Sequence, residues 1–154
     1  QPVKISCVVK TVTKDNKAQL VKFDNGLKIT AWHPIRLNGK FFFPCTVEEM
    51  PFEYEFFECE AVYNFVLESD HLMTVNGMEC VTLGHGFQED VVRHEYYGTS
   101  AIIDDLKRME GWENGLVMLG SGDMKRDEKS GMVVGMIKSG STSQVETQNT
   151  AVLV

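Results

Sequence analysis

Four Asn-Gly pairs constrain the fold of this chain more than any other feature of its sequence. They are Asn25-Gly26, Asn38-Gly39, Asn76-Gly77 and Asn114-Gly115. Asn-Gly readily adopts the positive φ angles of a type I′ turn, so the pair is a strong hairpin signal between apolar runs. We therefore predict that residues 1–86 are all β, with many strands paired through short turns.

The apolar runs between these turns give the expected strands. The predicted strands cover residues 4–12 and 19–23, joined across residues 14–17, and residues 28–32, 60–67, 72–75 and 78–81. Two aromatic-rich stretches, residues 41–44 and 50–57, are predicted to be core plugs or covered edge strands. An exposed aromatic binding patch is the alternative for these stretches.

The pattern changes after Gly84-His85-Gly86. Thr99 or Ser100 can cap a helix that Gly111 ends. Its predicted apolar face is formed by Ala101, Ile102, Ile103, Leu106 and Met109. Strands are expected over residues 116–119 and 132–137. We predict a mainly β core over residues 1–86, a small α+β appendage over residues 87–138 and a flexible tail over residues 139–154.

The composition excludes several classes of protein. The 154 residues are 43% hydrophobic and 24% charged, which is typical of one folded domain or of one domain with a small appendage. No apolar run approaches the roughly 18 residues of a membrane-spanning helix. A net charge of −7 argues against nucleic-acid binding. Residues 1–40 nevertheless hold eight Lys or Arg and two Asp, so they form either a solvated basic hairpin or a basic face for an acidic partner.

The four cysteines, Cys7, Cys45, Cys59 and Cys80, contain no Cys-x-x-Cys pair. This spacing predicts no metal site and too few bridges for a disulfide scaffold, although one bridge stays open as an alternative. Each cysteine is expected to behave as a small buried hydrophobic residue. No cofactor is predicted.

The motif Thr30-Ala31-Trp32-His33 follows the first Asn-Gly turn. A Thr and a His three residues apart at a strand end can both point into one cavity. There they could bond the amide nitrogen of a strained peptide bond and favour attack on the preceding carbonyl carbon. The alternative is a strand-end His that is bonded to the backbone.

A second group of motifs makes the pattern more specific. Val62-Tyr63-Asn64 is followed by His71 and by the hairpin that leads to Thr82-Leu83-Gly84-His85-Gly86. Together with residues 26–34, these motifs resemble the two signature blocks of Hint (hedgehog/intein) domains. Residues 94–99 and 102–106 make the chain most similar to the Vint variety, in which the Hint module accompanies a von Willebrand factor type A domain. The resemblance covers most of residues 1–120.

The resemblance implies a horseshoe-like β fold that rearranges its own backbone. In this family a cysteine at the first residue attacks the preceding carbonyl, which gives a thioester, and a second nucleophile then releases the upstream protein. By position, Thr30 and His33 would hold and protonate the scissile amide, and His71 matches a later-block histidine that assists. Asn64, Thr82 and His85 would lie close to the site. No metal is implied.

The sequence departs from the family pattern in three places. Residue 1 resembles a position inside the family's fold and not its first residue. We therefore expect the N-terminal nucleophile segment to be missing from these residues. We also expect the chain alone to be catalytically incomplete. Asn64 replaces the aspartate of inteins. Val81-Thr82 stands where inteins carry His-Asn, which makes asparagine cyclisation, and hence splicing, unavailable.

We therefore predict a single-turnover autoprocessing domain that cleaves or transfers without splicing. The alternative is a Hint scaffold that lacks the chemistry and binds a protein or a polyanion. The expected partners are an upstream precursor domain, such as a von Willebrand factor type A domain, and an unknown second nucleophile, for which an anionic glycan is one candidate. Five cations of the appendage could bind an anion, unless neighbouring acids neutralise them: Lys107, Arg108, Lys125, Arg126 and Lys129. His85, between two glycines, is predicted to line a turn near the site or to face solvent, and His94 is predicted to lie at the surface.

Overall fold

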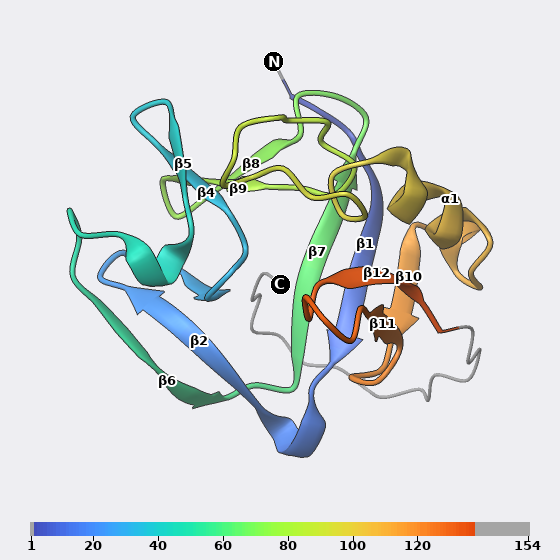
Figure 1. Cartoon of the computed structure of the whole chain (residues 1–154), viewed down its shortest axis with the longest axis horizontal. Helices are drawn as coiled ribbons and strands as arrows, with labels where there is room; N and C mark the ends of the chain where they lie inside the picture. The colour runs from blue at the N-terminus through green and yellow to red at the C-terminus, as the bar shows by residue number, and fades with distance from the viewer. Residues whose placement is uncertain (1, 138–154) are drawn as a thin grey trace.

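The computed structural model describes residues 2–137 and is mainly β (Figure 1). The predicted tail over residues 139–154 lies outside the described residues. The strands are β1 Ile5–Val12, β2 Lys17–Phe23, β3 Lys28–Thr30, β4 Ile35–Leu37, β5 Lys40–Phe42, β6 Phe52–Glu58, β7 Ala61–Leu67, β8 Leu72–Val75, β9 Met78–Val81, β10 Leu116–Leu119, β11 Met124–Arg126 and β12 Val133–Met136. The α-helix α1 covers Ser100–Lys107. In this described part, no helix has the length and apolarity that crossing a bilayer requires.

Three of the Asn-Gly pairs form the predicted hairpins. They connect β2 to β3, β4 to β5 and β8 to β9, each pair antiparallel. Asn38 and Asn76 have φ angles of 50° and 49°, and the following glycines also have positive φ, as a tight hairpin turn requires. Two of the turns also contact each other, because the side-chain amides of Asn25 and Asn76 each donate to the other residue's carbonyl, both at 3.1 Å.

The predicted basic hairpin between β1 and β2 does not form. A 3-10 turn over Lys14–Asn16 reverses the chain, with Asp15 and Asn16 at φ angles of 56° and 57°. The two strands then enter different ladders, with the orders β10-β1-β7 and β3-β2-β6. Thr13 holds the end of β1 beside the start of β7 and so away from β2. Its hydroxyl donates a hydrogen bond to the Glu60 carbonyl at 3.1 Å.

The fourth Asn-Gly pair is not a hairpin. Asn114 ends a 3-10 turn over Trp112–Asn114, and Gly115, at φ 78°, leads into β10. Strand β10 pairs with β1 in parallel, at a register of Val8 opposite Leu116. Strand β11, which was not predicted, forms a small antiparallel ladder with β12.

The aromatic stretch at residues 50–57 forms β6, which is an edge strand as predicted but is not covered. It pairs with β2 on one side. Tyr54 and Phe56 are 43% and 65% exposed, whereas Phe52 packs edge-on against Phe23 at 5.9 Å between ring centroids. Both ends of the strand therefore contribute to the core, through Phe52 and through Phe57, whereas its middle is exposed.

The helix α1 begins as predicted, with the Thr99 hydroxyl accepting a hydrogen bond from the backbone N–H of Ala101 at 3.3 Å. Ile102 and Leu106 are buried, whereas Ala101 is exposed although it was predicted on the apolar face. The helix and β10 pack on β1 and β7 in one hydrophobic core, whose buried members are Cys7, Val9, Val66, Leu83, Tyr96, Ile102, Leu106, Val117, Leu119 and Val133. Residues 87–137 therefore share both a sheet and a core with residues 2–86 (Figure 1).

Candidate functional site

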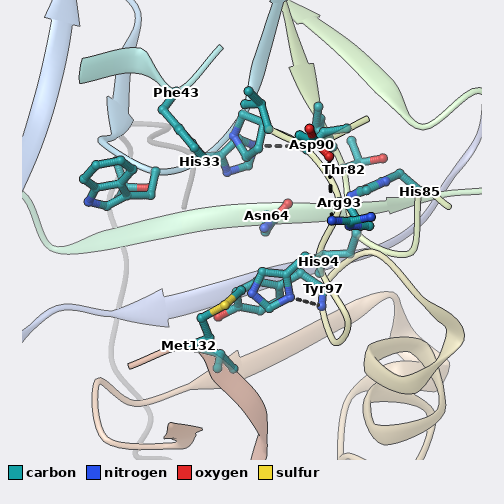
Figure 2. A pocket seen from close by; sticks show the side chains of 18 of the residues that line it. His33, Phe43, Asn64, Thr82, His85, Asp90, Arg93, His94, Tyr97 and Met132 are labelled. Atoms are coloured by element: carbon teal, nitrogen blue, oxygen red, sulfur yellow. Dashed lines mark hydrogen bonds and ion pairs between the residues drawn. The ribbon is translucent and has the colours of Figure 1, made fainter. Parts of the chain in front are cut away.

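A cavity of about 700 Å³ lies where the two halves of the chain meet (Figure 2). One wall comes from the strand ends and turns of residues 30–34, 43, 64 and 81–85. The other wall comes from residues 90–94, 97, 126 and 130–133. A cavity of this size accommodates several residues of an extended peptide or a small ligand.

Thr30 and His33 both line this cavity. Thr30 is the last residue of β3, and the chain turns immediately after it, with the backbone N–H of His33 donating to the Thr30 carbonyl at 3.2 Å. Their three-residue spacing at a strand end therefore brings them to one site. Their catalytic role stays a prediction.

A hydrogen bond to the backbone fixes which nitrogen of the His33 ring is available. His33 is 5% exposed, and its Nε2 lies 2.7 Å from the Val81 carbonyl oxygen. A carbonyl can only accept, so Nε2 carries the proton and Nδ1 keeps its lone pair. Burial lowers the pKa of His33 to about 4, partly opposed by the Val81 hydrogen bond, so the ring is neutral at pH 7.

The segment that follows β9 carries a second polar group into the cavity wall. Thr82 is 3% exposed, and its hydroxyl has no hydrogen-bond partner among residues 2–137. Asn64, on β7, is 9% exposed and uses its Oδ1 to accept a bond from the Phe65 backbone N–H at 2.9 Å. At neutral pH, this amide cannot take the acid/base role of the aspartate that stands here in inteins.

Two more histidines line the cavity, and the backbone also orients them. The Nδ1 of His85 accepts from the Phe87 N–H at 2.9 Å, and the Nδ1 of His94 accepts from the Tyr97 N–H at 2.9 Å. Both rings therefore carry their proton on Nε2. Burial lowers the pKa of His85 to about 4, with His71 and His94 adding to the effect, and burial also lowers the pKa of His94.

The position of His94 is a correction, because its charged neighbours Arg93 and Glu95 predicted a surface residue. Its ring packs against Tyr97 at 4.7 Å between centroids, in the loop before α1 (Figure 2). Gly98 allows this loop to lie close to the His85 ring, because a Cβ there would lie 2.8 Å from the His94 carbonyl oxygen and from Cε1 of His85. The run of two aromatic residues and a glycine after His94 is the sequence signal that could have indicated a packed loop.

His71 does not line the cavity. It lies behind Thr82, because its carbonyl accepts from the Thr82 backbone N–H at 3.0 Å. Its backbone is left-handed, at φ 52°, and its Nδ1 is buried without a partner among residues 2–137. His71 is close enough to His85 to lower that residue's pKa.

The predicted cations do not gather at the cavity. Of the five, Arg126 lines it, where its guanidinium donates to the Gly131 carbonyl at 2.8 Å. Arg93, which the sequence did not single out, lines the same wall and forms an exposed ion pair with Asp90 at 3.7 Å. Arg108 instead bonds Asp105, one turn earlier on the helix.

None of the four cysteines lines the cavity. Cys7, Cys59 and Cys80 are buried, and burial raises the pKa of the Cys80 thiol to about 12. Burial also raises the pKa of the other three thiols. A cysteine attacks as its thiolate, so these four are poor nucleophiles. Among residues 2–137, no group of three His, Cys, Asp or Glu residues could hold a metal ion.

Comparison with known proteins agrees with this arrangement. The family model of the Vint Hint-domain matches residues 1–135, which includes both walls of the cavity. No curated protein matches the chain. The chain therefore belongs to the Vint family of Hint domains, a class of self-cleaving, autoprocessing domains.

Proposed function

We propose that this domain cleaves its own precursor through a cysteine-dependent N-to-S acyl shift and releases the upstream protein without splicing. The observation that carries the proposal is the placement of Thr30 and a neutral, backbone-oriented His33 on one cavity. The nucleophile would be a cysteine upstream of the described residues, because all four cysteines here lie away from the cavity.

In the proposed first step, the cysteine sulfur attacks the carbonyl carbon of the preceding peptide bond. The thiol proton passes to Nδ1 of His33, which is the free lone pair of that ring. The same nitrogen then delivers the proton to the amide nitrogen as the C–N bond breaks, which leaves a thioester and a free amine. The Thr30 hydroxyl holds that amide in place.

The low pKa of His33 makes the ring a weak base towards the thiol but a strong acid once it is protonated. A proton on Nδ1 of a buried ring with a pKa of about 4 is held weakly and is passed on readily to a departing amine. Thr30 and His33 face the amide directly. We place His71 behind Thr82 as a supporting residue, which acts through the backbone bond to Thr82 and through its proximity to His85.

In the second step a nucleophile attacks the thioester, the C–S bond breaks, and the thiol recovers its proton from the nucleophile. Water, an alcohol or an amine would each satisfy this step. Arg93 and Arg126 on the wall opposite His33 favour an acceptor that carries a negative charge. An anionic glycan and an upstream von Willebrand factor type A domain as the released partner remain predictions.

The test uses a precursor that joins residues 1–154 to the sequence that precedes them in the natural protein. We expect His33→Ala to slow thiol-induced release of the upstream fragment by roughly 10²-fold or more, because the amide nitrogen leaves poorly unless it is protonated. Release rates are measured by gel electrophoresis and intact mass. A circular dichroism spectrum like that of the unsubstituted chain serves as the control for folding.

Two outcomes would contradict this proposal. An unchanged release rate in His33→Ala would remove His33 from the chemistry. A ligated product of the flanking segments would show splicing, which the proposal does not allow because Val81 and Thr82 resemble the intein His-Asn position and neither side chain can cyclise as asparagine does.

A further inference from the structure

The Thr82 hydroxyl is the polar group of the cavity wall whose bonding is unexplained. The side chain is almost fully buried, at 3% exposure, and Oγ1 has no hydrogen-bond partner in the described part of the chain. Buried hydroxyls in folded proteins are nearly always bonded. Thr82 lines the cavity, so a group that enters it and displaces the contacts covering Oγ1 would supply the missing partner.

The backbone holds Thr82 in one position. The N–H groups of three consecutive residues donate to three different segments: Val81 to Pro34 at 3.1 Å, Thr82 to His71 at 3.0 Å and Leu83 to Phe65 at 2.9 Å. Thr is also β-branched, so its side chain has little rotational freedom. The hydroxyl is therefore a preorganised group, of the kind that stabilises charge without first having to reorient.

The same stretch of backbone positions both Thr82 and His33. The Val81 carbonyl accepts from Nε2 of His33, and the next side chain along the chain is Thr82. Both line the cavity (Figure 2). A peptide bond offers two reacting polar atoms, its nitrogen and its carbonyl oxygen, and His33 is assigned to the nitrogen. The carbonyl oxygen has no donor in the steps proposed above.

We propose that Thr82 is a further catalytic residue, whose hydroxyl donates a hydrogen bond to the carbonyl oxygen of the reacting peptide bond. This inference rests on the proposed function. When sulfur attacks the carbonyl carbon, the C=O π electrons move onto the oxygen, and Thr82 stabilises this negative charge without giving up its proton. The carbonyl re-forms as the C–N bond breaks, and the nitrogen takes the proton that the thiol lost.

The decisive variants are Thr82→Val and Thr82→Ser in the same precursor. Valine keeps the shape of the side chain but removes the hydroxyl, so we expect thiol-induced release to slow by about 10²-fold, the loss typical of one preorganised donor. We expect no loss of stability in Thr82→Val, because the hydroxyl has no partner inside the described chain. Thr82→Ser keeps the donor and should stay within about threefold of the unsubstituted rate, far from the valine loss.

Thr13→Val is the matched control, since it makes the same chemical change at a hydroxyl with a structural role. Thr13 donates to the carbonyls of Cys59 and Glu60 and lies outside the lining of the main cavity. We expect this variant to unfold at a lower temperature while its release rate, measured where it is fully folded, is unchanged.

The outcomes separate this inference from the proposed function. If Thr82→Val releases as fast as the unsubstituted precursor while His33→Ala does not, the role of Thr82 is wrong and the proposed function stands. If Thr82→Val is destabilised as much as Thr13→Val, the hydroxyl has a structural role and the inference is also wrong. If no upstream fragment is released by the unsubstituted precursor, by Thr82→Val or by Thr82→Ser, both the inference and the proposed function are wrong.

Discussion

At the scale of single residues, three buried or half-buried histidines give the cavity its chemical character. In each ring, one nitrogen is occupied by a backbone hydrogen bond, which leaves Nδ1 of His33 as a base and Nε2–H of His85 and His94 as donors. All three pKa values are lowered by burial, so the rings are neutral at pH 7. The cavity thus provides both a hydrogen-bond acceptor and hydrogen-bond donors without fixed charge on its imidazoles.

These histidines also predict how stability depends on pH. The folded pKa of His33 and of His85 is about 4, below the ordinary value of 6.5, so the unfolded chain binds more protons between these values. The contribution of these two histidines to the free energy of unfolding is complete above pH 6.5 and is lost as the pH falls towards 4. It amounts to at most about 3 kcal/mol per histidine.

The free energy of unfolding, measured with urea at several pH values between 7 and 4, checks this prediction. His85→Gln removes one of the titrating rings, so its unfolding free energy should fall less steeply with decreasing pH than that of the unsubstituted chain. Equal slopes for the two chains would show that the His85 ring does not titrate differently in the folded state.

Local sequence patterns predicted part of the candidate site. Thr30 and His33 belong to one turn, so their spacing was enough to indicate a shared position. The packing of His94 against Tyr97 lies within one loop, so the aromatic residues that follow His94 could have indicated it. The environment of Thr82 depends on Pro34 and Phe65, and contacts with residues so distant in the chain leave little trace in the sequence around Thr82.

At the scale of elements, the hairpins were predictable because a tight turn is a property of two adjacent residues. The pairing of strands that are far apart in the sequence was not predictable in this way. The start of β1 gives no sign that it pairs antiparallel with β7 and parallel with β10, more than a hundred residues away. The same limit explains the wrong hairpin between β1 and β2, because the turn at residues 14–16 reverses the chain without pairing the strands.

The importance of one turn can be measured by paired glycine substitutions. Gly77, in the β8–β9 turn, has φ +84°, and a Cβ added there would meet nothing within 4 Å. Gly122 has the same open space but no positive φ. We expect Gly77→Ala to lower the free energy of unfolding by about 1–2 kcal/mol through backbone strain alone.

Gly122→Ala is the control for this comparison and should leave the stability unchanged or slightly increased. Urea unfolding of both variants at pH 7 measures the difference. Equal stabilities of the two variants would mean that the left-handed conformation at Gly77 is not required for the hairpin.

At the scale of the whole molecule, the two halves form the site together. The strand ends of residues 30–34 and 81–85 supply one wall, and the loop and strand residues 90–97 and 126–133 supply the other. Strand β10 continues the ladder of β1, and α1 packs on the same core. The sequence indicated a change of pattern after Gly86, but it did not indicate that the later residues complete the cavity.

The thioester is the central claim of the proposed function, and hydroxylamine is the most direct measurement of it. Neutral hydroxylamine attacks a thioester and leaves a hydroxamate on the released fragment, whereas hydrolysis leaves a carboxylate. We predict that the unsubstituted precursor, which joins residues 1–154 to their preceding sequence, releases an upstream fragment with the mass of the hydroxamate, and that His33→Ala releases roughly 10²-fold less. A fragment that carries only a carboxylate, or equal hydroxamate from both precursors, would contradict the account.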